Sequence, residues 1–75
     1  MLEKVVSIIS EYQGIPASDI KENSQLIQDL GFTSYDVVSI VGRFEGEFDI
    51  EVPDRKIKMM KTVADIVAFI ESQMS

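Results

Sequence analysis

Ser34 is the residue of this sequence whose type and position are best suited to covalent chemistry. It lies in the segment 29–36, at the predicted start of a helix. The first N–H groups of a helix have no intrahelical partner, and the helix dipole places partial positive charge there. A phosphate on the Ser34 side chain would therefore meet a ready anion site. The pattern indicates that Ser34 can carry a phosphodiester.

Serine is also common at helix starts for a purely structural reason, because its hydroxyl can cap free backbone N–H groups. Here Thr33 and Asp36 fit a capping box, with Thr33 as the N-cap and Asp36 at the third helical position. Thr33 then fills the cap position and leaves Ser34 without that role. Gly31 allows the chain to turn tightly just before the helix.

The residue types that are missing restrict the chemistry further. The 75 residues include no cysteine and no histidine, which excludes disulfides, thiolate nucleophiles, the usual zinc sites and a Ser-His-Asp triad. The acidic stretch around Asp49 fits no EF-hand loop, since Pro53 and Asp54 stand where an oxygen ligand and a glycine are needed. We therefore expect a non-catalytic binding or carrier protein without a metal site.

The charge of the chain bears on its partners. The formal net charge is −6, so we expect no nucleic-acid partner, and we expect faster encounters with basic protein surfaces. Residues 55–61 depart from this balance, because they hold four basic residues and no acidic one. We expect this basic run to be a solvated face, with contact to an acidic partner or to a phosphate as the alternatives. With no apolar run long enough to span a bilayer and no export signal, the sequence predicts a cytoplasmic protein that does not span a membrane.

Three apolar stripes predict the helices that must position Ser34. Each stripe has the spacing i, i+3, i+4, i+7 of one helix face, and the second and third extend to i+11. The stripes comprise Leu2, Val5, Val6 and Ile9; Val37, Ile40, Val41, Phe44 and Phe48; and Val63, Ile66, Val67, Ile70 and Met74. Gly14 and Pro16 end the first helix, and Thr62 with Asp65 repeats the capping signal before the last.

The remaining segments complete the predicted fold. Pro53-Asp54 can open a short helix that carries the basic run. Residues 15–32 form a long connection that contains too many turn residues for a regular helix and too much apolar surface to stay in water. Apolar and acidic residues alternate in the segment 48–52, as they do in a half-buried strand. The sequence offers no partner strand, so we expect an extended link whose apolar side chains point inward. The sequence thus predicts an all-α fold, a small four-helix bundle of three main helices and one short helix, with a long loop between helices 1 and 2.

Three segments together resemble the acyl carrier protein family. Asp29-Leu30-Gly31, followed by Ser34 and Asp36, is similar to the family's phosphopantetheine attachment signature. The stretch 45–54 is similar to the family's Glu-Glu-Phe-x-x-x-Ile-Pro-Asp stretch, and Lys61-Thr62-Val63 looks like the start of its last helix. The resemblance covers essentially the whole chain in register.

The resemblance implies a single acyl-carrier-type domain over residues 1–75, a four-helix bundle, and a covalent 4′-phosphopantetheine, derived from coenzyme A, on Ser34. The arm ends in a thiol, which would supply the sulfur that a chain without cysteine lacks. Acyl intermediates of fatty acid, polyketide or related specialised biosynthesis would be bound to that thiol as thioesters. The implied partners are a phosphopantetheinyl transferase and acyl-loading, condensing and acyl-transfer enzymes, which a monomeric carrier would serve.

Departures from the family pattern favour a specialised member. Thr33 and Tyr35 stand where the signature usually has Asp and Leu. The family's middle helix is usually its partner-recognition element, so its counterpart here supplies the candidate recognition residues. These are Tyr35, Asp36, Val38, Gly42, Glu45 and Glu47. The alternative function is an acidic helical protein–protein interaction module without a cofactor.

Overall fold

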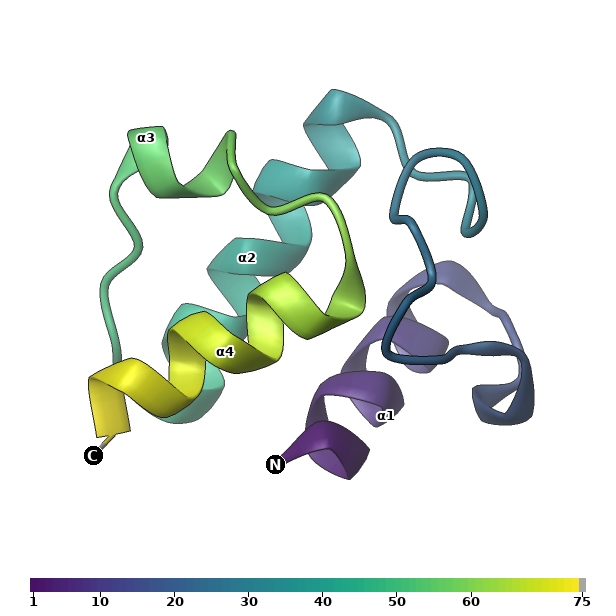
Figure 1. Cartoon of the computed structure of the whole chain (residues 1–75), viewed down its shortest axis with the longest axis horizontal. Helices are drawn as coiled ribbons and strands as arrows, with labels where there is room; N and C mark the ends of the chain where they lie inside the picture. The colour runs from purple at the N-terminus through teal and green to yellow at the C-terminus, as the bar shows by residue number, and fades with distance from the viewer. Residues whose placement is uncertain (75) are drawn as a thin grey trace.

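The protein folds into three main helices and one short one, and the computed structural model describes residues 1–74. In chain order the elements are α1 (Leu2–Gln13), the 3₁₀ turn η1 (Ala17–Asp19), α2 (Ser34–Phe48), α3 (Asp54–Ile57) and α4 (Val63–Met74). Figure 1 shows them around one interior, with α1 packed against both α2 and α4. No strand occurs within residues 1–74, so the predicted all-α class and the order of the helices are confirmed.

The helix boundaries follow the chemistry of their end residues. Gly14 ends α1 in the left-handed conformation at φ 71°, where its N–H donates to the carbonyl of Ser10. Thr33 and Asp36 form the predicted capping box at the start of α2. At α4, Thr62 and Asp65 exchange the same pair of hydrogen bonds, at 3.1 and 3.2 Å. Each predicted end signal therefore lies where a helix starts or stops.

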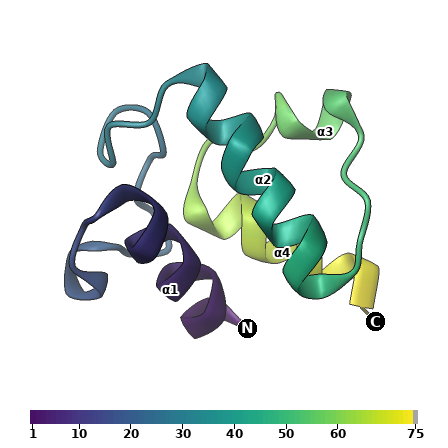
Figure 2. The ribbon, with the colours of Figure 1, turned by 180° about the vertical axis from the view of Figure 1, so that it is seen from behind.

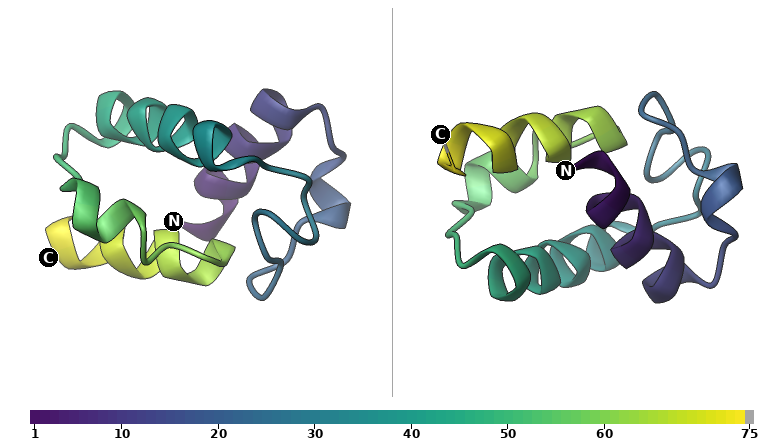
Figure 3. Two further views of the ribbon diagram at one scale, coloured as in Figure 1. Left: turned by 90° about the horizontal axis from the view of Figure 1, so that it is seen from above. Right: turned by 90° about the horizontal axis from the view of Figure 1, so that it is seen from below.

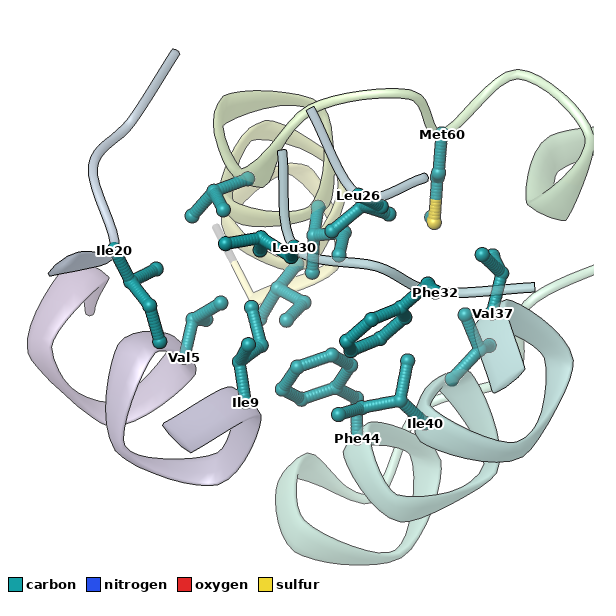
Figure 4. Packing of buried hydrophobic residues seen from close by; sticks show 14 of the residues in the cluster. Val5, Ile9, Ile20, Leu26, Leu30, Phe32, Val37, Ile40, Phe44 and Met60 are labelled. Atoms are coloured by element: carbon teal, nitrogen blue, oxygen red, sulfur yellow. The ribbon is translucent and has the colours of Figure 1, made fainter. Parts of the chain in front are cut away.

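The core forms where the three predicted stripes meet. Ile9 of α1, Phe44 of α2 and Ile70 of α4 are each at most 1% exposed, and complete burial of a side chain of this size stabilises the fold by about 1.5–3 kcal/mol. Figure 4 shows Ile9 and Phe44 pointing into the same interior as Phe32 of the long connection. The stripe of α4 stops at Ile70, because Met74 lies at the end of the helix and is 57% exposed.

Residues 14–33 lie at one end of the helices, as the two views in Figure 3 show. Backbone hydrogen bonds attach this connection to the segment before α4: Leu26 N–H donates to Lys61 O at 2.9 Å, and Val63 N–H donates to Ser24 O at 3.1 Å. Its apolar side chains cover the bundle as predicted, with Ile20, Leu26, Leu30 and Phe32 buried. The connection is therefore a packed part of the fold.

Ile27 differs from the buried apolar residues of this connection, because it is 55% exposed. The turns over residues 25–30 bring Leu26 and Leu30, four residues apart, onto the side that faces the bundle. Ile27 instead lies at the surface. The connection as a whole packs over the bundle as predicted, and Ile27 is one apolar side chain of it that stays at the surface.

The link from α2 to α4 takes the predicted course. Val52 is buried and Ile50 is half-buried, so the extended segment after α2 turns its apolar side chains inward. The short helix α3 begins at Asp54 as expected. Seen from behind in Figure 2, α3 lies beside α2 and faces the same end of the molecule as the start of α2. This arrangement places the basic run near Ser34.

Candidate functional site

Ser34 is the first residue of α2 and its side chain is exposed. The cap is made by its neighbours: Thr33 Oγ1 accepts from the N–H of Asp36 at 3.2 Å, and Asp36 Oδ2 accepts from the N–H of Thr33 at 3.0 Å. Within residues 1–74 the Ser34 hydroxyl makes no hydrogen bond, and neither do the backbone N–H groups of Ser34 and Tyr35. The site thus combines an uncommitted hydroxyl with two unpaired donors at the positive end of a helix.

Asp36 ties the start of α2 to α1. The Tyr12 hydroxyl donates to Asp36 Oδ1 at 3.0 Å, across the gap between the two helices. Hydrogen bonds from the Thr33 backbone, the Thr33 hydroxyl and the Tyr12 hydroxyl, in that order, hold the pKa of Asp36 below its usual range. The carboxylate is therefore ionised at neutral pH and remains an acceptor for all three groups.

Aromatic contacts support Tyr12 in this position. Its ring lies 5.7 Å from the ring of Phe32, centroid to centroid, and the guanidinium of Arg43 lies 5.5 Å from the Tyr12 ring centroid. Phe32 is buried, and its N–H donates to Leu26 O at 2.9 Å. The segment before α2 is therefore anchored, which fixes the position of Ser34 at the surface.

Gly31 makes the turn into this segment possible. Its φ is 75°, a left-handed conformation that side chains with a Cβ rarely adopt. The side-chain amide of Gln13 donates to the carbonyl of Leu30 at 2.9 Å and holds the turn against the end of α1. The left-handed turn thus explains why position 31 is a glycine.

A hollow of about 570 Å³ opens beside Ser34, between α2, the connection and the segment after α3. Its apolar lining includes the buried Leu26, Val37 and Met60. Polar and charged side chains complete the lining, which in full comprises Gln25, Leu26, Ile27, Gln28, Ser34, Val37, Val38, Ile57, Lys58, Met60 and Lys61. A group attached to Ser34 therefore has apolar surface next to it.

The six candidate recognition residues do not form one surface. Tyr35 and Val38 are 76% and 55% exposed and lie next to Ser34. Gly42 and Glu47 instead line a second hollow, of about 450 Å³, on the side of α2 that faces α1. Asp36 is held in the cap and by Tyr12 as described above.

Glu45 has a structural role in addition to its predicted one. Its Oε2 accepts a hydrogen bond from the N–H of the buried Val52 at 2.9 Å, which fastens the link after α2 to the helix itself. Of the six candidates, only Tyr35 and Val38 share the surface of Ser34. Recognition by all six residues stays a prediction.

The structure also brings residues to the site that sequence reasoning did not assign to it. Ile27 lines the hollow from the connection, and Met60 lines it from the segment after α3. Met59 lies next to Met60 and is 65% exposed. Tyr12 reaches the site from α1 through a contact that spans 24 residues of sequence. No local sequence signal pairs such distant residues, although the adjacent methionines within the basic run could have drawn attention to that segment.

Within residues 1–74 no group of three or more potential metal-ligating side chains comes together. No helix in the described part of the chain is long and apolar enough to cross a bilayer.

A family model and several known proteins match most of this chain. Residues 3–70 match the family model described as the phosphopantetheine attachment site. An acyl carrier protein of Akkermansia muciniphila is 45% identical over 69 residues, which cover 92% of this chain and 86% of the relative. An acyl carrier protein of Thermotoga maritima is 43% identical over 74 residues, which cover 99% of this chain and 91% of the relative. An acyl carrier protein of Clostridium acetobutylicum is 42% identical over 72 residues, which cover 96% of this chain and 94% of the relative.

Proposed function

The chain belongs to the acyl carrier protein family, and from that premise we propose that Ser34 is the residue that carries its phosphopantetheine arm. The chain has a phosphopantetheine attachment site and is a non-catalytic carrier in fatty acid or related biosynthesis. The proposal adds the residue that carries the arm and the classes of enzyme that act on it.

One observation carries the assignment to Ser34. Its hydroxyl is exposed and uncommitted, while two unpaired backbone N–H groups lie at the same helix start. Such a helix start favours a phosphate electrostatically and by hydrogen bonding. The other two serines of this region differ from Ser34, since Ser24 is buried and Ser39 is half-buried inside α2.

Attachment is a phosphoryl transfer in which Ser34 provides the nucleophile. The Ser34 oxygen forms a bond to the pantetheine-side phosphorus of coenzyme A, and the diphosphate bond to that phosphorus breaks. Adenosine 3′,5′-bisphosphate leaves, and the hydroxyl proton passes to a base on the transferase. The chain contains no histidine, the commonest general base, which is consistent with a base on the transferase.

The residues around Ser34 fit such an arm. The N–H groups of Ser34 and Tyr35 are free to hold a phosphodiester, and the apolar wall of Leu26, Val37 and Met60 lies beside it. When bound, the arm supplies a terminal thiol, which is a group that this chain lacks. The chain's own contribution is to fix the attachment point through Thr33, Asp36 and Tyr12.

The family implies interaction with a phosphopantetheinyl transferase and with biosynthetic enzymes. We further propose that these include acyl-loading, condensing and acyl-transfer enzymes, and that residues 1–75 act as a monomeric, cytoplasmic carrier domain. The off-pattern Thr33 and Tyr35 and the basic run support a specialised member. Fatty acyl, polyketide and aminoacyl groups would all be carried on the same arm, so the attachment residue does not distinguish between them.

Intact-mass measurement distinguishes the carrier from a cofactor-free interaction module. The purified chain is incubated with a phosphopantetheinyl transferase and coenzyme A, together with the variants Ser34→Ala and Ser39→Ala. The wild type and Ser39→Ala gain the mass of one phosphopantetheine, whereas Ser34→Ala gains none. An unchanged wild-type mass with several transferases would instead favour the module.

A further inference from the structure

Exposed apolar side chains gather around Ser34. Six large hydrophobic residues are exposed within residues 1–74, and two of them, Met1 and Met74, lie at the ends of the chain. The other four are Ile27, Tyr35, Val38 and Met59, which we call the apolar rim. Ile27 and Val38 line the hollow that contains Ser34, Tyr35 follows Ser34 in the first turn of α2, and Met59 lies between two lining residues.

The members of the apolar rim lie at or next to one hollow, and this clustering indicates an interaction site. Exposed hydrophobic residues scattered singly over a protein need no explanation, whereas a contiguous group with a polar border marks an interaction site. Tyr35 and Met59 are 76% and 65% exposed, so much of their apolar surface is free to be buried by another molecule. Aromatic residues and methionine are enriched in protein–protein interfaces.

The charge beside the rim is positive, although the chain as a whole is acidic. Lys58 and Lys61 line the hollow, and no acidic residue does. Within the described residues neither lysine forms an ion pair. Both cations are therefore available to a partner.

Three carboxylates of the segments around the hollow accept hydrogen bonds within the fold. Asp29 accepts a hydrogen bond from the N–H of Gln25 at 2.8 Å. Asp65 accepts from the N–H groups of Lys61 and Thr62 at 2.9 and 3.1 Å. Asp36 is held by Thr33 and Tyr12. These acids cap turns and helices and form no ion pair with Lys58 or Lys61 within the described residues, so both ammonium groups are free to meet carboxylates of a partner.

We propose that the apolar rim, with Lys58 and Lys61 on its α3 side, docks a partner protein that presents an apolar protrusion beside carboxylate groups. The proposal rests on the proposed function, since this partner acts on the arm of Ser34. Charge complementarity selects an acidic partner surface, because like charges placed together across an interface oppose binding. A membrane with anionic headgroups would also meet the lysines, but the rim borders a hollow of about 570 Å³, which fits a protruding side chain of a protein better than a flat lipid surface.

The lysines test the sign of the partner's charge. The holo chain is offered to a purified acyl transferase and a purified condensing enzyme from the same cell, and kcat/KM is measured for the wild type and for Lys58→Glu/Lys61→Glu. The control Lys4→Glu/Lys21→Glu changes the net charge equally at positions outside the hollow. The proposal predicts at least a tenfold fall in kcat/KM, carried by KM, for the first variant with one of the enzymes and less than a twofold change for the control.

The apolar part is tested with two exposed methionines. Met59→Ser removes a member of the rim, while Met74→Ser makes the same change at the end of α4, where the side chain is 57% exposed. We expect KM to rise about threefold or more for Met59→Ser and to stay unchanged for Met74→Ser. Thermal unfolding checks that all variants remain folded.

The outcomes separate this inference from the proposed function. Mass spectrometry first confirms the arm on Ser34, so a missing arm contradicts the proposed function and not the docking surface. If the arm is present, equal kinetics for the two lysine variants with both enzymes would overturn the inference. A rise in kcat/KM for Lys58→Glu/Lys61→Glu would overturn it too, because the partner surface would then be basic. Sedimentation with phosphatidylglycerol vesicles that depends on both lysines would overturn it in favour of a membrane.

Discussion

The hydroxyl of Tyr12 donates a hydrogen bond to Oδ1 of Asp36 across 3.0 Å, although 24 residues separate the two in the sequence. The bond joins the end of α1 to the first turn of α2. Because Asp36 also closes the capping box with Thr33, one carboxylate fixes both the direction of α2 and its position against α1. Ser34 lies between the two capping residues and takes its position from them.

The first prediction concerns acid stability and Asp36. Its pKa in the folded chain is lowered by hydrogen bonds from Thr33 and then from Tyr12. A carboxyl whose pKa is lower in the folded state stabilises the fold above its unfolded pKa, about 3.9, and loses that contribution as pH falls through the folded value. The wild type should therefore exceed Asp36→Asn in stability at neutral pH, and the difference should shrink as pH falls below about 4.

Urea unfolding between pH 3 and 7 measures this difference. Tyr12→Phe is the matched variant, because it removes one of the hydrogen bonds that lower the pKa and leaves the carboxyl in place. Its loss of stability should likewise diminish in acid. A difference between the wild type and Asp36→Asn that stays constant over the whole pH range would contradict the prediction.

Two glycines should respond to alanine in opposite directions. Gly31 has φ 75°, and forcing an alanine into that conformation should cost about 1–2 kcal/mol. Gly42 lies inside α2, and apart from its chain neighbours and the helix's own backbone no atom lies within 4 Å of an added Cβ, so Gly42→Ala should stabilise the chain by up to about 1 kcal/mol. Chemical denaturation compares the two variants. Destabilisation by Gly42→Ala would contradict the open helix surface described here.

Two isoleucines test the distinction between the core and the apolar rim. Ile40 is fully buried, so Ile40→Val should cost about 0.5–1.5 kcal/mol of stability. Ile27 is 55% exposed, and Ile27→Val should change the stability by less than about 0.5 kcal/mol. Equal losses in urea unfolding would mean that Ile27 is packed into the core.

The repeating apolar stripes were sufficient to predict the three main helices, because the i, i+3, i+4, i+7 spacing and the capping residues act locally. The same local signals predicted the end at Gly14 and the capping boxes at Thr33 and Thr62. Residues 25–30 were harder, because their turns decide which side chains face the bundle. Ile27 shows this: its apolar type favours burial, and the turn geometry places it at the surface.

The candidate site was predictable only in part. Ser34 follows from a local motif and its cap, whereas the surface around it is built from the connection, α2 and the segment after α3. Contacts between such distant segments, such as Tyr12 with Asp36, leave no periodic trace in the sequence. The same holds for Glu45, whose hydrogen bond to Val52 depends on how the chain folds back after α2.

A specialised carrier should exchange poorly with general fatty acid synthesis. The basic run and the off-pattern Tyr35 alter the surface around Ser34, so partners adapted to an acidic surface should bind it weakly. A reconstituted fatty acid synthesis system with this chain in place of its own carrier measures the effect. We expect turnover at least tenfold below that of the system's own carrier. Normal turnover would contradict a specialised role.

The position of the arm can be measured directly by fragmentation mass spectrometry. The chain is treated with a phosphopantetheinyl transferase and coenzyme A and is then digested with trypsin. The peptide that spans residues 22–43 contains Ser24, Ser34 and Ser39, so fragment ions distinguish the three serines. The account predicts one phosphopantetheine on Ser34 and none elsewhere. A modified peptide with the group on Ser24 or Ser39, or an arm outside this peptide, would contradict it.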